Sequence, residues 1–558
     1  TKLSQLKVIT TDFGSPRPRY ILHAGNSKRD LEIADMASDE YIVMLPYLAH
    51  GHLIPFLALA RQIQQRTGFT IIIASTKLNI QYLRRSSVSV DDSNFPSHSS
   101  IRFVELPFCS SAHDLPPDTE NTENLSLNKM INLFHASVSL KDPLLHVLHD
   151  IIDQEGRPPL CIISDVFFGW AVDVAKSVGA MHITFSTGGA YGTMTYVSLW
   201  LNLPHRSTDS DEFKLPGFPE SYRFHRSQLH QYLRVADGTD MWSTFMQPQI
   251  SRCLESSGWL CNTVEEIEPF GLDLLRKYLR LPVWTIGPLL PQAALKKPSS
   301  SHSSSISGQH AGKKSGVPPE KCLEWLDLKS ADSVLYISFG SQNTIGASQM
   351  MELAKGLEDS AKSFIWVIRP PLGFDINGEI RAEWLPEGFE ERIRENKRGL
   401  LVRNWAPQLD ILAHKSTGAF LSHCGWNSIL ESLSQGVPMI GWPMAAEQAY
   451  NSKMLTEEMG LSVELTRGHQ SVIEGKEVKR VVELVMDEKG KGKDMRKKAA
   501  EVRVQIRSAI REEGEEQGSS VKAIDDFVRT IVSKRGALTA NQLGSKISEK
   551  ELPTILSN

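Results

Sequence analysis

The 558-residue sequence has few cysteines, no long apolar run and almost no net charge. Its six cysteines lie far apart, with no CxxC pair and no zinc-ligand spacing, so we expect free thiols in a reducing, cytoplasmic compartment. No apolar run approaches the length of about 18 residues that a membrane-spanning helix needs. The 61 basic and 65 acidic residues give a formal charge of -4, without the basic excess that gathers nucleic acid. We therefore expect a monomer whose partners are small molecules.

Short apolar runs separated by helical stretches occur twice along the chain, which predicts parallel sheets buried on both faces. The fold class predicted is α/β, with two Rossmann-like domains. The runs of the first domain are YIVMLPY (41–47), FTIIIAST (69–76), IRFVELPF (101–108), CIISDVF (161–167) and HITFST (182–187). Those of the second are SVLYISFGS (333–341), SFIWVIR (363–369), GLLVRNW (399–405), GAFLSHCG (418–425) and VPMIGWP (437–443).

The segment between these two halves is rich in Ser, Gly and Lys and has almost no large apolar residue, which is typical of a flexible linker. The first residues match neither pattern and are set apart as a disordered or non-native extension. The predicted division is an extension (1–38), a first Rossmann-like domain (39–288), a linker (289–318), a second Rossmann-like domain (319–515), a C-terminal helix packing back on the first domain (516–535) and a tail (536–558).

The segment from Trp405 to Gln448 has the most informative chemistry. Trp405 follows a strand, where an indole face can stack on a nucleobase with about 1 to 3 kcal/mol. The run HCGWNS, from His423 to Ser428, follows the next strand and opens a helix whose free N–H groups and dipole suit a diphosphate. Glu431, one turn later, can accept hydrogen bonds from ribose hydroxyls.

This segment closely resembles the signature box of plant family 1 UDP-dependent glycosyltransferases, on WAPQ, HCGWNS, E, GVP, WP and EQ together. The resemblance implies a GT-B fold, with two sheets facing an interdomain cleft, and a UDP-glucose donor. It also implies that residues 39–288 bind the acceptor and residues 319–515 bind the UDP-sugar. Gln448 at the end of the box points to glucose, and Trp426 in place of an arginine argues against a uronic acid donor. The donor-binding residues implied are Ser341, Trp405, Ala406, Gln408, His423, Gly425, Trp426, Asn427, Ser428, Glu431, Glu447 and Gln448.

Within that set, the likeness places Trp405 and Gln408 at uracil and Glu431 at the ribose. It places His423, Asn427 and Ser428 at the phosphates, and Trp426, Glu447 and Gln448 at the sugar. The helix terminus and His423 are then expected to neutralise the leaving diphosphate, so that no metal is needed.

The catalytic base is expected in the first domain, where GHLIP follows the first strand. His52 lies at a helix start, whose dipole disfavours imidazolium and keeps the ring neutral. Asp165 ends the strand CIISD and can orient the ring through its far nitrogen. GHLIP and SDVFFGW also resemble the family segments with the catalytic His and Asp, which implies an inverting displacement. His50 competes for the role of base, and His52 is favoured because it directly precedes LIP.

Other interpretations remain open. A catalytically silent sensor would keep the sugar-nucleotide box without turnover. A nucleotide-dependent oxidoreductase is weak, because no GxGxxG follows a strand. The DxD-like residues Asp209 and Asp211 lie in a polar loop and are interpreted as solvated charge. The acceptor is expected to be a flavonoid, phenylpropanoid or terpenoid, with a preference for phenolics. This expectation rests only on aromatic residues near strand ends, each of which is more typical of a core residue: Phe108, Phe167, Phe168, Trp170, Phe185 and Tyr191.

Overall fold

The structure, a computed structural model, describes residues 40–88, 101–123, 125–295, 316–468, 472–512 and 516–550. The expected extension, most of the expected linker and the end of the expected tail lie outside these residues.

The first domain is built on a seven-stranded parallel sheet with the order β3-β2-β1-β4-β5-β8-β9. The central strands are rich in Val and Ile and buried on both faces, as parallel sheets require. The order reverses direction between β1 and β4, and open α/β sheets bind ligands beyond the strand ends at such a switch point. The strands are β1 (Tyr41–Leu45), β2 (Thr70–Thr76), β3 (Ile101–Leu106), β4 (Cys161–Asp165), β5 (Met181–Ser186), β8 (Trp259–Cys261) and β9 (Val283–Thr285).

The second domain repeats this plan on a six-stranded parallel sheet with the order β12-β11-β10-β13-β14-β15. Its switch point lies between β10 and β13. The two parallel sheets confirm the predicted α/β class with two Rossmann-like domains. The strands are β10 (Val334–Ser338), β11 (Ser363–Ile368), β12 (Gly399–Arg403), β13 (Thr417–Ser422), β14 (Met439–Gly441) and β15 (Ser462–Glu464).

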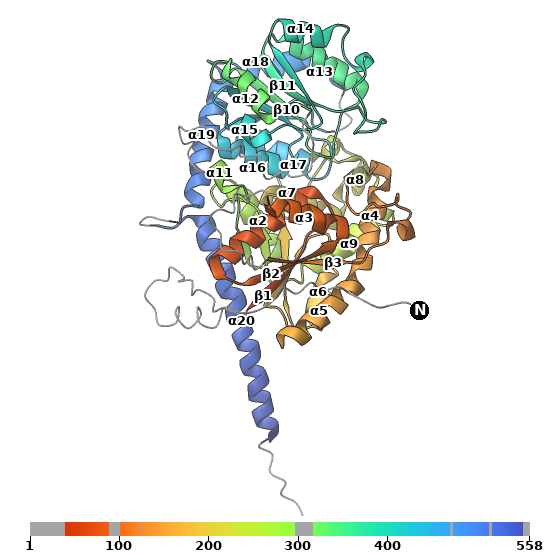
Figure 1. The fold of residues 1–558 in the computed structure, drawn as a ribbon, viewed down its shortest axis with the longest axis vertical. Helices are drawn as coiled ribbons and strands as arrows, with labels where there is room; N and C mark the ends of the chain where they lie inside the picture. The colour runs from red at the N-terminus through yellow and green to blue at the C-terminus, as the bar shows by residue number, and fades with distance from the viewer. Residues whose placement is uncertain are drawn as a thin grey trace, which may run out of the picture.

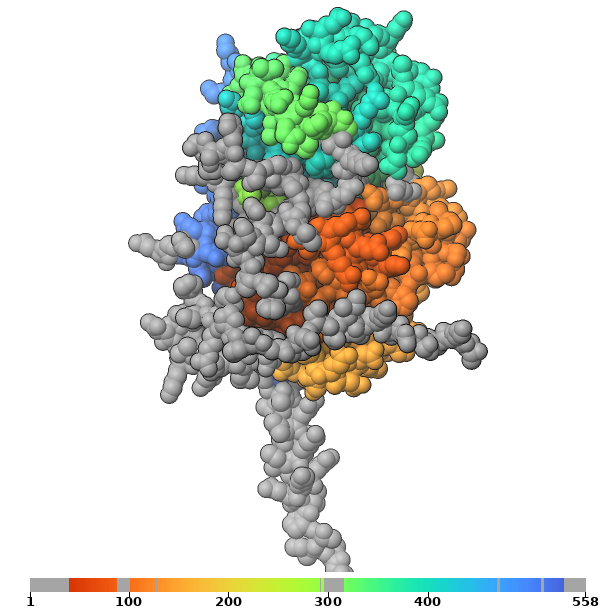
Figure 2. Space-filling view, viewed as in Figure 1, coloured from red at the N-terminus to blue at the C-terminus, as the bar shows by residue number. Residues whose placement is uncertain are grey.

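Helices cover both faces of each sheet, and the second domain lies above the first in Figures 1 and 2. Those of the first half are α2 (His50–Thr67), α3 (Lys77–Val88), α4 (Met130–Ser137), α5 (Lys141–Glu155), α6 (Ala171–Ser177), α7 (Ala190–Asn202), α8 (Gln231–Val235), α9 (Met241–Cys253) and α10 (Pro269–Leu279). Those of the second half are α11 (Gln292–Leu295), α12 (Pro319–Asp327), α13 (Ala347–Asp359), α14 (Phe389–Glu395), α15 (Gln408–Ala413), α16 (Trp426–Gln435), α17 (Gln448–Lys453), α18 (Gly475–Val485) and α19 (Lys491–Ala509).

The C-terminal helix α20 (Ser519–Lys550) runs along the first domain (Figure 1). Phe527 packs on Trp284, with ring centroids 5.3 Å apart, and the Trp284 indole N–H donates to Asp526 at 2.8 Å. The helix continues beyond residue 535, where we expected it to end and a tail to begin.

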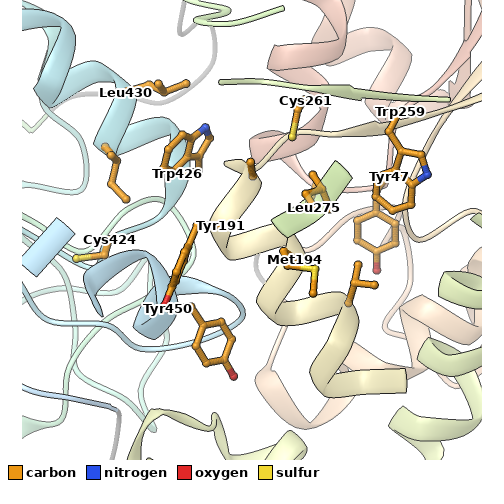
Figure 3. Packing of buried hydrophobic residues seen from close by; sticks show 14 of the residues in the cluster. Tyr47, Tyr191, Met194, Trp259, Cys261, Leu275, Cys424, Trp426, Leu430 and Tyr450 are labelled. Carbon is orange, nitrogen blue, oxygen red and sulfur yellow. The ribbon is translucent and has the colours of Figure 1, made fainter. Parts of the chain in front are cut away.

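One apolar cluster joins the two domains. It contains Tyr191 and Met194 of α7 in the first domain and Trp426 and Tyr450 of the second (Figure 3). Because these side chains are buried against one another, the loops after the strands of the two sheets are held close together.

Candidate active site

His52 and Asp165 form a hydrogen-bonded pair at the switch point of the first sheet. β1 and β4 are neighbours, and Leu45 pairs with Ser164, so the first turn of α2 lies beside the end of β4. His52 Nδ1 lies 2.6 Å from Asp165 Oδ2, and the other carboxylate oxygen accepts from the Phe167 N–H at 3.1 Å. The Asp165 side chain is fully buried, whereas that of His52 is 24% exposed. The ring therefore has a fixed inner edge and an outer edge that can be reached.

The surroundings of His52 act on its pKa in opposite directions. Burial lowers the pKa, while the charge and hydrogen bond of Asp165 and the charge of Glu447 raise it, and the net result lies above 6.5. We expected the helix dipole to keep the ring neutral. The adjacent carboxylate instead raises the pKa against the effect of burial, so the pair favours proton uptake by the imidazole.

His50, the competing histidine, has different partners. Its ring stacks on Tyr82, with centroids 4.0 Å apart, and its Nε2 lies 3.7 Å from a carboxylate oxygen of Glu123. The geometry therefore pairs Asp165 with His52.

In the second domain, Gln408 links the predicted uracil and ribose contacts. Its amide nitrogen donates to Ser428 Oγ at 3.1 Å and to Glu431 Oε2 at 2.5 Å. Burial raises the pKa of Glu431 to about 7. Trp405 is half-buried at the end of the preceding loop, and Ala406 is buried beside it. An indole, an amide and a carboxyl group therefore line one stretch of this domain.

Two non-glycine residues of the box, and the residue that precedes it, have left-handed backbone angles. Asn404, next to Trp405, has a φ of 67°, Cys424 in HCGWNS has 62°, and Ala446, next to Glu447, has 50°. Each such residue costs on the order of 1 to 3 kcal/mol, and strain of this kind gathers at functional sites. The surrounding fold therefore holds the three loops in fixed shapes.

His423 lies between two glycines at the start of α16. A Cβ on Gly340 would lie 2.6 Å from its Nε2, and one on Gly425 would lie 2.4 Å from it. Burial and then the charge of Arg369 lower the pKa of His423 to about 4. Without a ligand the ring is therefore uncharged at neutral pH and can hydrogen-bond to a diphosphate; its expected part in neutralising the leaving diphosphate stays a prediction.

The two groups of residues meet at the domain boundary. The Asn427 side-chain amide donates to the Gly51 carbonyl at 3.0 Å, one residue from His52. Glu447 lies near enough to His52 to raise its pKa. The candidate base and the signature box thus belong to one interdomain site.

Comparison with known proteins agrees with this arrangement. Residues 280–498 match the family described as "UDP-glucoronosyl and UDP-glucosyl transferase", and residues 39–291 match "Glycosyltransferase, N-terminal domain". UDP-glycosyltransferase 92A1 of Arabidopsis thaliana is 43% identical over 501 residues, which cover 88% of this chain and 97% of that protein. The chain belongs to the plant UDP-glycosyltransferases.

Two further relatives of this UDP-glycosyltransferase extend the comparison. Crocetin glucosyltransferase 3 of Crocus sativus is 46% identical over 457 residues, covering 81% of this chain and 92% of that protein. The structure of UGT73P12 of Glycyrrhiza uralensis, solved with glycyrrhetinic acid 3-O-monoglucuronide, matches with a TM-score of 0.75 and 25% identity over 92% of this chain and 99% of that one. The comparisons confirm the predicted family, its GT-B fold and its enzyme class.

Two of the residues predicted at the sugar of this UDP-glycosyltransferase have side chains already held by hydrogen bonds. The Trp426 indole N–H donates to the Asn262 carbonyl at 2.6 Å, and its ring lies against Gly189, so this side chain is engaged with the first domain. The side-chain oxygen Oε1 of Gln448 accepts from the backbone N–H groups of Met444 and Ala445, both at 2.9 Å, which fixes the orientation of the side-chain amide. Ser341 is exposed in the loop after β10.

The sequence analysis missed the polar residues of the first domain that support Trp426. Asn262 directly follows β8 and supplies the carbonyl for the indole. Glu268 is buried and accepts from the N–H groups of Ala190 and Tyr191 at 2.9 and 3.0 Å, which holds the start of α7 beside Gly189. The signal available for Asn262 was its place just after a parallel strand, whereas Glu268 lies at the start of α10 and had no such signal.

The aromatic residues proposed for the acceptor divide into two groups. Phe168, Trp170, Phe185 and Tyr191 are buried core residues. Phe108 and Phe167 are half-buried, and the Phe167 ring centroid lies 5.7 Å from that of His52. Tyr47, which we had not singled out, lies 5.5 Å from His52 by the same measure.

In the part of the chain that the structure describes, no helix is both long and apolar enough to cross a membrane. Asp209 and Asp211 are exposed, and among the described residues no three His, Cys, Asp or Glu side chains form a group suited to a metal ion.

Proposed function

We propose that this UDP-glycosyltransferase transfers glucose from UDP-glucose to a hydroxyl group of a small lipophilic acceptor, with His52 as general base. The observation that carries the proposal is the 2.6 Å contact between His52 Nδ1 and the buried carboxylate of Asp165, next to the signature box. Because Nδ1 is engaged by Asp165, Nε2 is the ring nitrogen that accepts the proton of the acceptor.

The reaction is a single displacement. The acceptor oxygen gives its proton to His52 Nε2 and attacks the anomeric carbon from the face opposite the diphosphate. The bond from that carbon to the diphosphate oxygen breaks, and UDP leaves with the electron pair. Asp165 stabilises the imidazolium that forms. Inversion gives a β-linked sugar from an α-linked donor.

The donor is held by the second domain. Trp405 stacks on uracil, Gln408 lies beside it, and Glu431 accepts from the ribose. The diphosphate binds at the start of α16, to Asn427, Ser428 and His423, and to Ser341, without a metal. The fixed Gln448 amide presents its N–H groups to a glucose hydroxyl. A solved relative that is 28% identical, from Phytolacca americana, was complexed with UDP-2fluoro-glucose and pterostilbene, which supports a glucose donor.

The acceptor we propose is a phenolic, such as a flavonoid or phenylpropanoid, with terpenoids as the next class. Phe167 and Tyr47 next to His52 offer aromatic contacts to a flat acceptor. Relatives are named for crocetin, anthocyanin and scopoletin, so membership of the family leaves the acceptor open. We also propose a cytosolic monomer, since all six cysteines are free thiols and both halves of the site come from one chain.

The test is incubation of the full chain with UDP-glucose and a pooled set of plant aglycones, followed by mass spectrometry for hexose addition. UDP-galactose, UDP-xylose and UDP-glucuronic acid serve as comparison donors. We expect a hexose on phenolic acceptors, with UDP-glucose as the preferred donor. No sugar addition to any hydroxylated acceptor, with any of these donors, contradicts the proposal.

A further inference from the structure

The loop after β10 is held by a single arginine. Arg369, the residue after β11, donates to the carbonyl oxygens of Ser341 at 2.7 Å and Asn343 at 2.8 Å, and also to that of Gly340. This loop contains Ser341, which the sequence analysis placed at the diphosphate. Three neutral carbonyl groups thus satisfy one guanidinium.

Arg369 has no acidic partner among the described residues, where no carboxylate lies within 4.0 Å of it. Burial lowers its pKa to about 10, so it stays protonated at neutral pH. Arg369 is half-buried, and a partly desolvated cation bonded only to neutral groups is unfavourable, so an anion bound nearby would relieve this penalty.

The charge of Arg369 acts on the pKa of His423. It contributes, after burial, to the lowered pKa of that histidine. His423 is 9% exposed, and its buried Nδ1 has no hydrogen-bond partner among the residues that the structure describes. The outer edge of the ring lies between Gly340 of the Arg369-bound loop and Gly425, the residue that precedes α16. The loop, the ring and the helix start therefore form one continuous surface.

The orientation of the loop follows from peptide geometry. In a trans peptide the C=O of one residue and the N–H of the next point in opposite directions. When the carbonyls of Gly340 and Ser341 point at Arg369, the N–H groups of Ser341 and Gln342 point away from it. Arg369 thus sets the direction of two backbone donors as well as the local charge.

We propose that Arg369 is a positioning residue for the donor diphosphate: it orients the loop 340–343 through three backbone carbonyl groups and supplies a positive charge beside that loop. The inference rests on the proposed function only in assuming that the donor is a UDP-sugar. It assigns the electrostatic part of diphosphate binding to a residue outside the signature box.

The test is calorimetric titration of the full chain with uridine, UMP and UDP, in the natural protein and in Arg369→Met and Arg369→Lys. For Arg369→Met we expect UDP affinity to fall by about 10- to 100-fold, the size of a lost interaction with a charged group. UMP affinity should fall less, and uridine affinity should change by less than about twofold, because uridine has no charge to stabilise. Arg394→Met, an exposed arginine of the same domain, is the matched control and should bind all three ligands unchanged.

Arg369→Lys keeps the cation and loses the planar fork, so it covers the case in which Arg369→Met fails to fold. We expect it to retain more UDP affinity than Arg369→Met and to keep the salt dependence of the natural protein, whereas Arg369→Met should lose less affinity at high salt because it has one positive charge fewer. Equal losses of uridine and UDP affinity in both variants would show a purely structural role, and unchanged UDP affinity would show no role; either overturns the inference alone. Failure of the natural protein to bind UDP would instead contradict the proposed function.

Discussion

Each domain places a histidine beside the switch point of its sheet, yet the two rings have opposite shifts in proton affinity. His52 follows β1, whereas His423 follows β13, which corresponds to β4 of the first sheet. The pKa of His52 is raised because, against the effect of burial, Asp165 stabilises its charged form. The pKa of His423 is lowered to about 4 because burial is reinforced by Arg369. The nearest charged side chain, rather than the fold, decides what each imidazole can do.

This difference matches the chemistry proposed for each side. A base must take a proton and hold it, which an adjacent carboxylate supports. A ring next to a diphosphate that stays neutral can donate or accept a hydrogen bond without itself becoming the counter-ion. The counter-ion is then Arg369, which lies outside the box.

The largest effect is expected from His52→Ala. We expect turnover to fall by about 1,000-fold or more, since a positioned base contributes about 10²- to 10⁴-fold. UDP affinity should stay within about twofold, because the donor contacts come from the second domain. The measurement is kcat for glucose transfer alongside calorimetric UDP binding.

His50→Ala is the matched control, because its ring contacts Tyr82 and Glu123 instead of Asp165. It should retain most of the activity. If His52→Ala kept full turnover, the first domain would contain a different base, and the comparison between the two histidines would lose its functional meaning.

The second effect is expected from Asp165→Asn, which tests the cause of the raised pKa. Turnover requires neutral His52, so activity is lost as the pH falls through the raised pKa of that residue. Removing the carboxylate lowers this pKa, and the acid limb of kcat/KM should move to lower pH while kcat falls by about 100-fold. The measurement is the pH profile of both proteins. An acid limb that stays in place would mean that another group produces it.

The sequence predicted the fold and the box because both depend on local order. Apolar runs separated by helical stretches specify the parallel strands, and the box identifies Trp405, His423 and Glu431 by their positions within it. The charge of each histidine depends on side chains from distant segments, such as Asp165 for His52 and Arg369 for His423. The contact between Trp426 and Asn262 joins residues of different domains in the same way, and no pattern along the chain indicates it.

A third prediction extends the comparison to carboxyl groups. Asp165 is buried beside an imidazole, whereas Glu431 is buried beside the neutral Gln408, and its pKa is raised to about 7. Ribose binding needs the ionised form, so UDP affinity should fall by up to about tenfold per pH unit below 7. Titrations between pH 5.5 and 8 check this (a range chosen to span the pKa of about 7).

Glu431→Gln should bind UDP more weakly at pH 8 and lose most of that pH dependence. An unchanged slope in Glu431→Gln would assign the dependence to the phosphates of the ligand or to another side chain.

The smallest effect is expected from Asp173→Asn. This half-buried carboxylate of α6 pairs with Arg252 at 2.9 Å and lies 3.8 Å from Lys141, so its partners are not those of His52. Surface ion pairs contribute about 0 to 1 kcal/mol, so stability should change little and kcat by less than about twofold. Thermal unfolding and initial rates measure both. A loss comparable to that of Asp165→Asn would show that the electrostatics of the active site extend much further than the pair.

The most direct test of the account is an NMR pH titration of the full chain labelled with ¹³C-histidine, with His52→Gln and His423→Gln used to assign the two signals. The account predicts that His52 titrates above 6.5 and His423 at about 4, and that Asp165→Asn moves only the first of these downward. A His52 signal that titrates below 6.5, or one that Asp165→Asn leaves unchanged, would contradict it.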